Sequence, residues 1–319
     1  MASIFEMKTA TLTSDSSRDA AMAGVFYGIT AFGIWGLVPI YYKALGHVSS
    51  LEIVAHRVVW AMVALFILVL VKRQGRIIVS ELRNLRNLVF YLITTVLVSS
   101  NWLIFIWAIH NDRLLESSLG YYINPLVSVV LGVLFLRERL NGRQVLAVAL
   151  AAVGVLNLII RFGSFPWIAL TLALTFGLYG LLRKRAGGDA IRGLSIETLL
   201  ATPIALIFLG TLALHGGGAF GRINLTTDVL LVFAGIVTAI PLVCFLQAAR
   251  RLHLSTVGLM QYLAPTLNFL LAVLVYGEPF TRTHLITFAC IWVALAIYSF
   301  DVFSRATKII GARRKGLVS

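Results

Sequence analysis

The chain is built from long apolar stretches that are separated by short polar connections. Each stretch is close to the ~20 apolar residues that a helix needs to cross the hydrocarbon core of a bilayer. Most connections are too short to hold a separate soluble domain. The pattern therefore predicts an all-α integral membrane protein with ten membrane-spanning helices, at residues 21–45, 51–71, 86–109, 113–136, 143–161, 164–183, 194–214, 227–249, 253–276 and 283–303.

The stretch from Leu114 to Leu140 occurs a second time in a related form. Six of its positions are matched at a constant offset of 140: Leu114 by Leu254, Leu119 by Leu259, Tyr122 by Tyr262, Pro125 by Pro265, Val133 by Val273, and Glu138 by Glu278. Composition alone does not readily produce a set of matches that includes a proline and a glutamate. The chain is predicted to be an internal duplication, which fixes the architecture before any single helix is assigned.

Further matches extend the duplication to the whole chain. The segment 32–37 is echoed by 176–181, and Ser50-Leu51-Glu52 by Ser195-Ile196-Glu197. The two repeats then cover 21–161 and 164–303, with five predicted spans each. Because five is odd, the repeats must enter the membrane in opposite directions. Inverted repeats are typical of secondary transporters, which bind their substrate near the midplane where the repeats meet.

The composition agrees with a membrane protein. Hydrophobic residues make up 59% of the chain and charged residues 13%, against about 25% charged in soluble domains. The first twenty residues are polar and lack the apolar core of a cleavable signal peptide. Cys244 and Cys290 both lie inside predicted spans without a neighbouring histidine, so they are interpreted as small buried side chains. No metal site, disulfide or cofactor is predicted.

The basic residues indicate the orientation. Of the 27 Lys and Arg residues, 21 fall in the two tails and the even-numbered connections, and five fall in the odd-numbered connections. The positive-inside rule therefore places both tails, 1–20 and 304–319, in the cytoplasm. The basic side is expected to contact the anionic lipids of the inner leaflet. Nucleic acid is not expected as a partner, because no stripe of basic and aromatic residues lies outside the spans.

Arg57 is the remaining basic residue, and it alone lies clearly within a predicted span. A charge inside the membrane is costly and usually lines a cavity or meets a partner. Arg57 is expected to face a cavity near the outer side, with Glu52 as a candidate partner; snorkelling to the interface is the alternative. Glu52 also fits a capping box with Ser49. His56 is a candidate proton-binding group.

Other polar and aromatic residues at depth complete the candidate cavity. Asn101 needs a hydrogen-bond partner, which a neighbouring helix or a substrate would supply. Aromatic side chains offer surfaces on which substrate rings stack. The predicted cavity residues are Trp35, His56, Arg57, Asn101, Trp102, Tyr121, Tyr122, Asn124, Tyr179, Gln261 and Tyr262.

Prolines inside the spans predict kinks. A proline removes a helical hydrogen bond, and a backbone carbonyl freed at midplane survives only against protein or a water-filled cavity. The predicted kinks are at Pro39, Pro125, Pro241 and Pro265.

Several segments resemble the drug/metabolite transporter superfamily, with paired EamA domains, and more closely its RarD-type branch. They are 33–39, 52–57, 101–107, 118–126, 261–267 and 276–278, and the similarity extends from Gly24 to Phe303. Ser117 and Tyr122 depart from the usual Ala and Phe of that branch. The resemblance implies ten helices, the cytoplasmic membrane of a bacterium, and transport of small molecules.

We therefore expect a secondary transporter that moves small amphiphilic metabolites or drugs, such as amino-acid-like or aromatic compounds, with protons as a candidate coupling ion. Export is expected by analogy with the family. A passive channel or flippase-like facilitator is the alternative. An intramembrane enzyme is disfavoured, because no nucleophile–base pair or metal-ligand motif lies within the spans.

Overall fold

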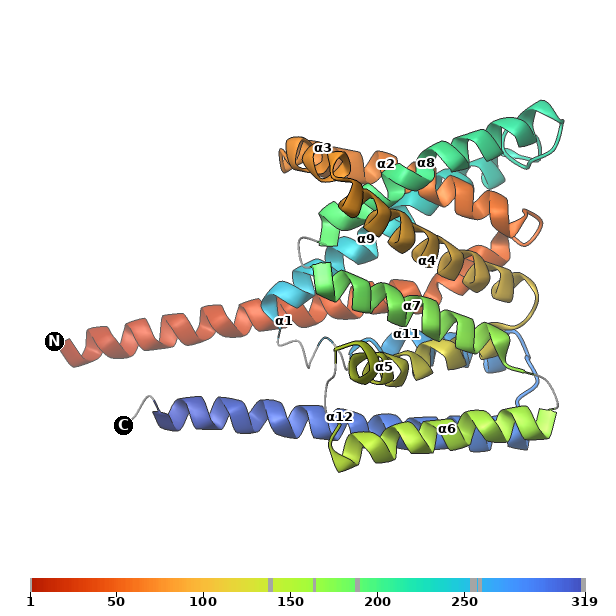
Figure 1. Cartoon of the computed structure of the whole chain (residues 1–319). Helices are drawn as coiled ribbons and strands as arrows, with labels where there is room; N and C mark the ends of the chain where they lie inside the picture. The colour runs from red at the N-terminus through yellow and green to blue at the C-terminus, as the bar shows by residue number, and fades with distance from the viewer. Residues whose placement is uncertain are drawn as a thin grey trace.

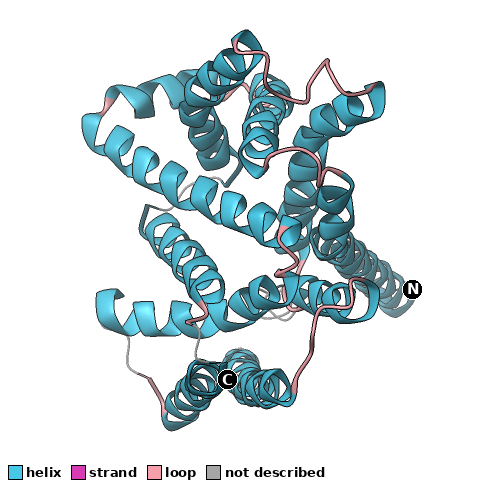
Figure 2. Ribbon diagram, turned by 90° about the vertical axis from the view of Figure 1, so that its right-hand side faces the viewer, coloured by secondary structure: helices cyan, strands magenta, loops and turns pink. Residues whose placement is uncertain are grey.

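The computed structural model of the chain describes residues 2–136, 140–162, 165–186, 190–252, 257 and 260–316. All regular elements in these ranges are helices (Figure 2). They are α1 (Ala2–Ala44), α2 (Ser50–Val71), α3 (Gly75–Arg83), α4 (Leu85–His110), α5 (Leu114–Leu136), α6 (Gly142–Phe162), α7 (Trp167–Ala186), α8 (Ala190–Leu214), α9 (Leu225–Arg251), α11 (Leu263–Leu270), the π-helical turn η1 (Leu271–Val275) and α12 (Arg282–Gly316).

The predicted all-helical membrane architecture is confirmed. Within the described ranges, eight helices are long and apolar enough to cross a membrane. Two shorter apolar helices, Trp167–Arg183 and Leu263–Val275, correspond to the sixth and ninth predicted spans. Both chain ends lie at the same end of the bundle (Figure 1), as an even number of crossings requires.

Three features differ from the predicted elements. The helix α1 starts at Ala2, so the polar first twenty residues are part of a helix, and α12 continues through most of the basic tail to Gly316. The connection after the second span contains the short helix α3. Its Ile78 is buried while its neighbours Ile77 and Val79 are exposed, and Arg76 and Arg83 flank them. This mixture is typical of a helix at a membrane surface.

The ninth predicted span is not one regular helix. Residues 261–262 form a turn, α11 starts at Leu263, and its last turn widens into η1. Pro265 therefore stands in the first turn of α11, where a missing N–H costs no helical bond. The residues 253–256 at the start of this span, and Glu138 in the first repeat, lie outside the described residues.

The helices α6 and α12 lie side by side at one edge of the bundle (Figure 1). They approach closely because Gly154 has no side chain; a Cβ atom there would lie 3.0 Å from Cβ of Cys290. Asn157 Nδ2 also donates to Thr287 Oγ1 at 3.2 Å. These two helices are the fifth and tenth predicted spans.

Glycines also bring other helices together. A Cβ at Gly120 of α5 would lie 2.7 Å from the carbonyl oxygen of Ala169 in α7. A Cβ at Gly235 of α9 would lie 2.4 Å from the backbone carbonyl carbon of Trp60 in α2. In lipid, no hydrophobic force drives helices together. Small residues at such crossings let the helices approach closely, and the resulting van der Waals packing holds them together.

Two carboxylates connect the repeats at the end of the bundle opposite the chain termini. Glu278 of the second repeat accepts the backbone N–H groups of Leu114 and Leu115, each at 2.8 Å, at the start of α5. Burial raises the pKa of the Glu278 carboxyl, and these two N–H groups partly oppose the shift. Glu52 of the first repeat accepts the N–H of Ala219 at 2.7 Å, in the loop before α9.

Candidate functional site

Arg57 lies in α2, about two turns from the end of that helix opposite the chain termini, and only 9% of it is exposed. Its Nη1 donates to the hydroxyl of Tyr42 in α1 at 2.8 Å. The guanidinium carbon lies 4.1 Å from the ring centroid of Trp102 in α4, which is a cation–π contact. Its Nε is buried without a hydrogen-bond partner. The Nε–H group of the buried Arg57 is thus available to donate to a further acceptor.

The candidate pairing of Arg57 with Glu52 is wrong. The Glu52 carboxylate is directed to the loop before α9, where Ala219 and the more distant Phe220 N–H, at 3.4 Å, donate to it. The capping prediction is half right, since Ser49 Oγ accepts the Glu52 N–H at 3.2 Å. The Glu52 carboxylate therefore holds the loop before α9 and does not neutralise the Arg57 guanidinium.

His56 is buried next to Arg57, with 5% exposed. Its ring lies 4.8 Å from the ring of Phe220, and its Nε2 has no hydrogen-bond partner. The structure places His56 against the same loop that Glu52 holds. Its role in proton binding stays a prediction.

Aromatic side chains form a continuous path from Arg57 toward the opposite end of the bundle. Successive ring centroids are 5.5 to 6.4 Å apart along this path. We call it the aromatic path; its members are Tyr42, Phe105, Tyr121, Phe176 and Tyr179. The rings come from four helices of both repeats, α1, α4, α5 and α7. Their faces and edges suit stacking of another aromatic group.

Asn101 holds three of these helices together. Its Nδ2 donates to the carbonyl oxygen of Leu172 at 3.0 Å and to Thr175 Oγ1 at 2.9 Å, both in α7. Its Oδ1 accepts the hydroxyl of Tyr121 at 3.0 Å. The side chain is 2% exposed. In this structure its hydrogen bonds are made between helices, which was one of the two expected possibilities.

Tyr122 and Tyr262, which occupy matched positions in the two repeats, contact each other. Their rings are nearly parallel, at 16°, with centroids 6.5 Å apart. The Tyr122 hydroxyl is also 2.7 Å from Thr266 Oγ1 of α11. The contact lies where α5 of the first repeat meets α11 of the second. Thus one of the residue pairs that indicated the duplication lies at the junction of the repeats.

Three other predicted cavity residues have different surroundings. Trp35 packs on Phe32 and on Phe245 of α9, with centroids 5.5 and 6.1 Å away. Asn124 has a buried Oδ1 without a hydrogen-bond partner. Gln261 is exposed in the turn before α11. Among the described residues, no hydrogen bond or ring contact joins any of these three to the aromatic path.

Pro39, Pro125 and Pro241 lie within helices, and the kinks at these positions stay a prediction. Pro203 in α8 is a fourth that the sequence reading missed. Near Pro265, the Ser118 hydroxyl donates to the proline's own carbonyl oxygen at 2.8 Å. This bond links α5 to α11 close to the tyrosine pair.

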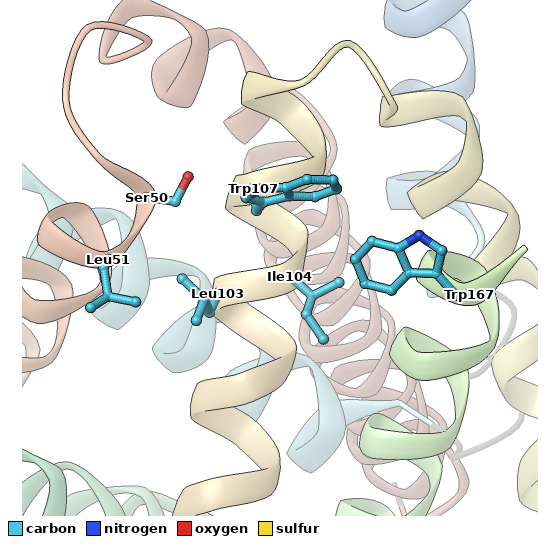
Figure 3. A pocket seen from close by; sticks show the side chains of 6 residues that line it. All are labelled: Ser50, Leu51, Leu103, Ile104, Trp107 and Trp167. Atoms are coloured by element: carbon cyan, nitrogen blue, oxygen red, sulfur yellow. The ribbon is translucent and has the colours of Figure 1, made fainter.

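A pocket of about 370 Å³ opens between α2, α4 and α7, at the end of the bundle opposite the chain termini. Figure 3 shows the Trp107 and Trp167 side chains facing each other on one side and Leu51 on the other. The complete lining is Ser50, Leu51, Leu103, Ile104, Trp107 and Trp167. It is mainly apolar, and none of its residues was in the predicted cavity set.

Glu197 of α8 lies beside two of the predicted cavity residues, although it was not itself among them. Its carboxylate Oε2 accepts the hydroxyl of Tyr179 at 3.0 Å, at the far end of the aromatic path. With Trp102 it lines a small internal pocket, together with Val58, Val98, Ser99, Thr198 and Ala201. The match between Ser195-Ile196-Glu197 and the segment around Glu52 was the available signal. Among the described residues, no three His, Cys, Asp or Glu side chains gather as metal ligands.

The comparisons with known proteins agree with this architecture. The EamA-like transporter family matches the chain twice, at residues 22–160 and 165–300. An uncharacterized transporter of Vibrio cholerae is 51% identical over 281 residues, which are 88% of this chain and 93% of that protein. The protein RarD of Escherichia coli (strain K12) is 45% identical over 278 residues, 87% of this chain and 94% of its own length.

A solved crystal structure superposes on the chain with a TM-score of 0.55 and 18% sequence identity, and covers 86% of this chain and 96% of its own. That similarity concerns the fold alone. The two family matches, the apolar helices and the bacterial relatives together define a multi-pass bacterial membrane protein that acts as a transporter and is not an enzyme. The chain belongs to the EamA-like transporter family, as a RarD-type member of the drug/metabolite transporter superfamily.

Proposed function

We propose that this protein is a secondary transporter that exports small amphiphilic compounds, such as amino-acid-like or aromatic metabolites and drugs. The observation that carries the proposal is Arg57, a buried cation with an unpartnered Nε at the start of the aromatic path. A guanidinium binds carboxylates strongly, because its hydrogen bonds are charge-assisted. An aromatic or apolar group of the same compound would pack on the neighbouring rings.

The outer pocket shown in Figure 3 fits the apolar part of such a compound. Its residues Ser50 and Leu51 lie on α2 before Arg57, and Leu103 follows Trp102 directly on α4. Ligand pockets are usually mainly apolar, with a few polar groups that fix orientation. We assign this pocket as the outer vestibule and Arg57 as the polar anchor beneath it.

Alternating access between the two repeats is the proposed mechanism. The repeats comprise residues 21–161 and 164–303, and the second is inverted relative to the first. Transporters of this construction expose a fixed site to one side and then the other by rocking the repeats. The stacked Tyr122 and Tyr262 lie at the junction where such a movement is centred.

The proposed location is the bacterial cytoplasmic membrane, with the tails 1–20 and 304–319 in the cytoplasm. The partition of the basic residues supports this orientation. Anionic lipids are the proposed partners of the basic side, and protons are the proposed coupling ion.

Comparison of metabolites in a deletion strain and in an overexpressing strain tests the function. We expect one or more aromatic or amino-acid-like carboxylates to accumulate inside the deletion strain and in the medium of the overexpressing strain. The same compounds should move against their gradient in vesicles when a proton gradient is imposed. Movement only down the compound's own gradient would identify a passive facilitator. Unchanged metabolite profiles would contradict export.

A further inference from the structure

Glu197 is an acidic side chain buried within a membrane-spanning helix. It lies in the second turn of α8, and only 1% of it is exposed. Tyr179 donates its hydroxyl to Oε2, whereas Oε1 has no hydrogen-bond partner. Acidic residues within membrane spans are rare and often belong to proton relays. The neighbours of the Glu197 carboxyl and the space around it determine which cation it can bind.

The surroundings supply little to neutralise a carboxylate. Among the described residues, no Lys, Arg or His nitrogen lies within the 4.0 Å of an ion pair with Glu197. The ionisable groups that act on it are Tyr179 and Arg183, both of α7, and α4 presents the hydroxyl of Thr94. From α2 the neighbour in the shared pocket is the apolar Val58.

The space beside Glu197 limits the size of a ligand. The pocket that it shares with Trp102 is too narrow to hold a water molecule. In the closed arrangement of this structure, neither a hydrated metal ion nor the ammonium group of a substrate has room beside the carboxyl. A proton adds to the carboxyl without displacing any neighbouring atom, and burial disfavours an ionised carboxyl whose cationic neighbour, Arg183, lies beyond ion-pair distance.

We infer that Glu197 is a proton-binding site of this transporter. The proton is taken from water on one side of the membrane when the pocket is open to it, forming the O–H bond of the carboxyl. The bond breaks when the opposite side opens, and the proton leaves to water there. No oxidation or reduction is involved. This inference rests on the proposed function, and it names the residue that carries the coupling ion.

Trp102 connects this site to the proposed substrate anchor. Its ring lies against the guanidinium of Arg57 and also lines the Glu197 pocket. A shift of Trp102 on substrate binding would therefore change the space around the carboxyl. Coupling between two sites requires an element with two arrangements, and occupation of each site must favour one of these arrangements over the other. The indole between Arg57 and Glu197 is placed to be that element.

Infrared spectroscopy of the full chain in lipid vesicles tests the inference without any substrate. Protonated carboxyl groups have a C=O stretching band that ionised ones lack, so spectra are recorded across a pH titration. We expect a pH-dependent carboxyl band that disappears in Glu197→Gln. The matched control is Glu52→Gln, at the equivalent position of the first repeat, where the carboxylate is bonded to backbone N–H groups; this variant should keep the band.

Two outcomes overturn the inference. One is a band that persists unchanged in Glu197→Gln. The other is pH-dependent transport that survives this variant and is lost in His56→Gln. If Glu197→Gln does not fold, Tyr179→Phe replaces it, because loss of the hydrogen bond to Oε2 should shift the frequency of the band. No shift would count against the assignment. The infrared measurement needs no substrate. It can therefore contradict proton binding by Glu197 even when the metabolite comparison supports export.

Discussion

A buried guanidinium has to be stabilised by its neighbours, and those of Arg57 come from two other helices. The sequence identified Arg57 because no other Lys or Arg lies clearly inside a predicted span. It did not identify Tyr42 and Trp102 as its partners, since contacts between helices follow no fixed sequence spacing. Glu197 was missed for a related reason. Near the start of a span, a glutamate resembles one that favours a helix N-terminus, and only the contact with Tyr179 reveals its burial.

Replacing Arg57 tests its role in binding. Arg57→Lys is expected to reduce transport almost as much as Arg57→Ala, by roughly ten- to a hundredfold, which corresponds to the loss of a charged hydrogen bond. Lysine keeps the charge but lacks the planar fork that contacts Tyr42 and Trp102 together. Transport of the compound found in the metabolite comparison is measured at matched expression. Restoration of transport by lysine would indicate that Arg57 only reaches the membrane interface.

At the scale of helices, the positions and lengths of the apolar elements were predictable, whereas the details of their packing were not. Hydrophobic length alone identified ten crossings. It could not predict α3, whose nine residues mix apolar with charged and polar side chains, nor the widening of α11 into η1. Both depend on the neighbouring elements. The sequence also does not show which helix each packing glycine contacts, because Gly120, Gly154 and Gly235 contact helices that are distant in the sequence.

The crossing of α2 and α9 depends on Gly235. Gly235→Ala is expected to destabilise the protein by about 1–3 kcal/mol, because the added methyl would overlap the backbone of Trp60, which cannot move independently. The control is Gly210→Ala in α8, where a Cβ meets nothing within 4 Å. Melting temperatures of the purified variants in detergent measure the difference. Equal melting temperatures would show that the two helices separate easily at this point.

Pro125 is expected to serve transport more than folding. A proline within a membrane helix leaves the carbonyl one turn earlier, near Tyr121, without its helical N–H partner. Pro125→Ala should therefore reach the membrane in normal amounts and transport several-fold less. Membrane abundance and transport are measured on the same cells. Normal transport at equal abundance would make the proline an ordinary packing residue.

At the scale of the molecule, the duplication was the most informative feature of the sequence. It predicted the number of helices in each half and, from the odd number, their opposite directions. The stacked Tyr122 and Tyr262 show that matched positions meet in space. The cavity was less predictable, because aromatic residues in an apolar chain serve packing as well as binding. Tyr42, Phe105 and Phe176 join the aromatic path, whereas Trp35 packs on Phe32 and Phe245.

Reporter fusions test the orientation of the whole chain. Fusions after Arg76 and after Ala186 should report a cytoplasmic location, and fusions after His47 and after Arg222 an external one. The reason is the partition of 21 against five basic residues. Alkaline phosphatase and fluorescent-protein reporters give complementary signals at each position. A cytoplasmic signal after Arg222 would exclude the inverted arrangement of the second repeat.

The bonds from Glu278 to the first turn of α5 have a consequence for biosynthesis. Leu114 leaves the ribosome 164 residues before its acceptor, which at bacterial rates of 5–20 residues per second is an interval on the order of 10–30 s. During that time the N–H groups of Leu114 and Leu115 depend on water at the membrane surface. The first repeat is thus expected to enter the membrane before this helix end is capped, and a nascent chain arrested between the repeats would leave the two N–H groups without their carboxylate acceptor.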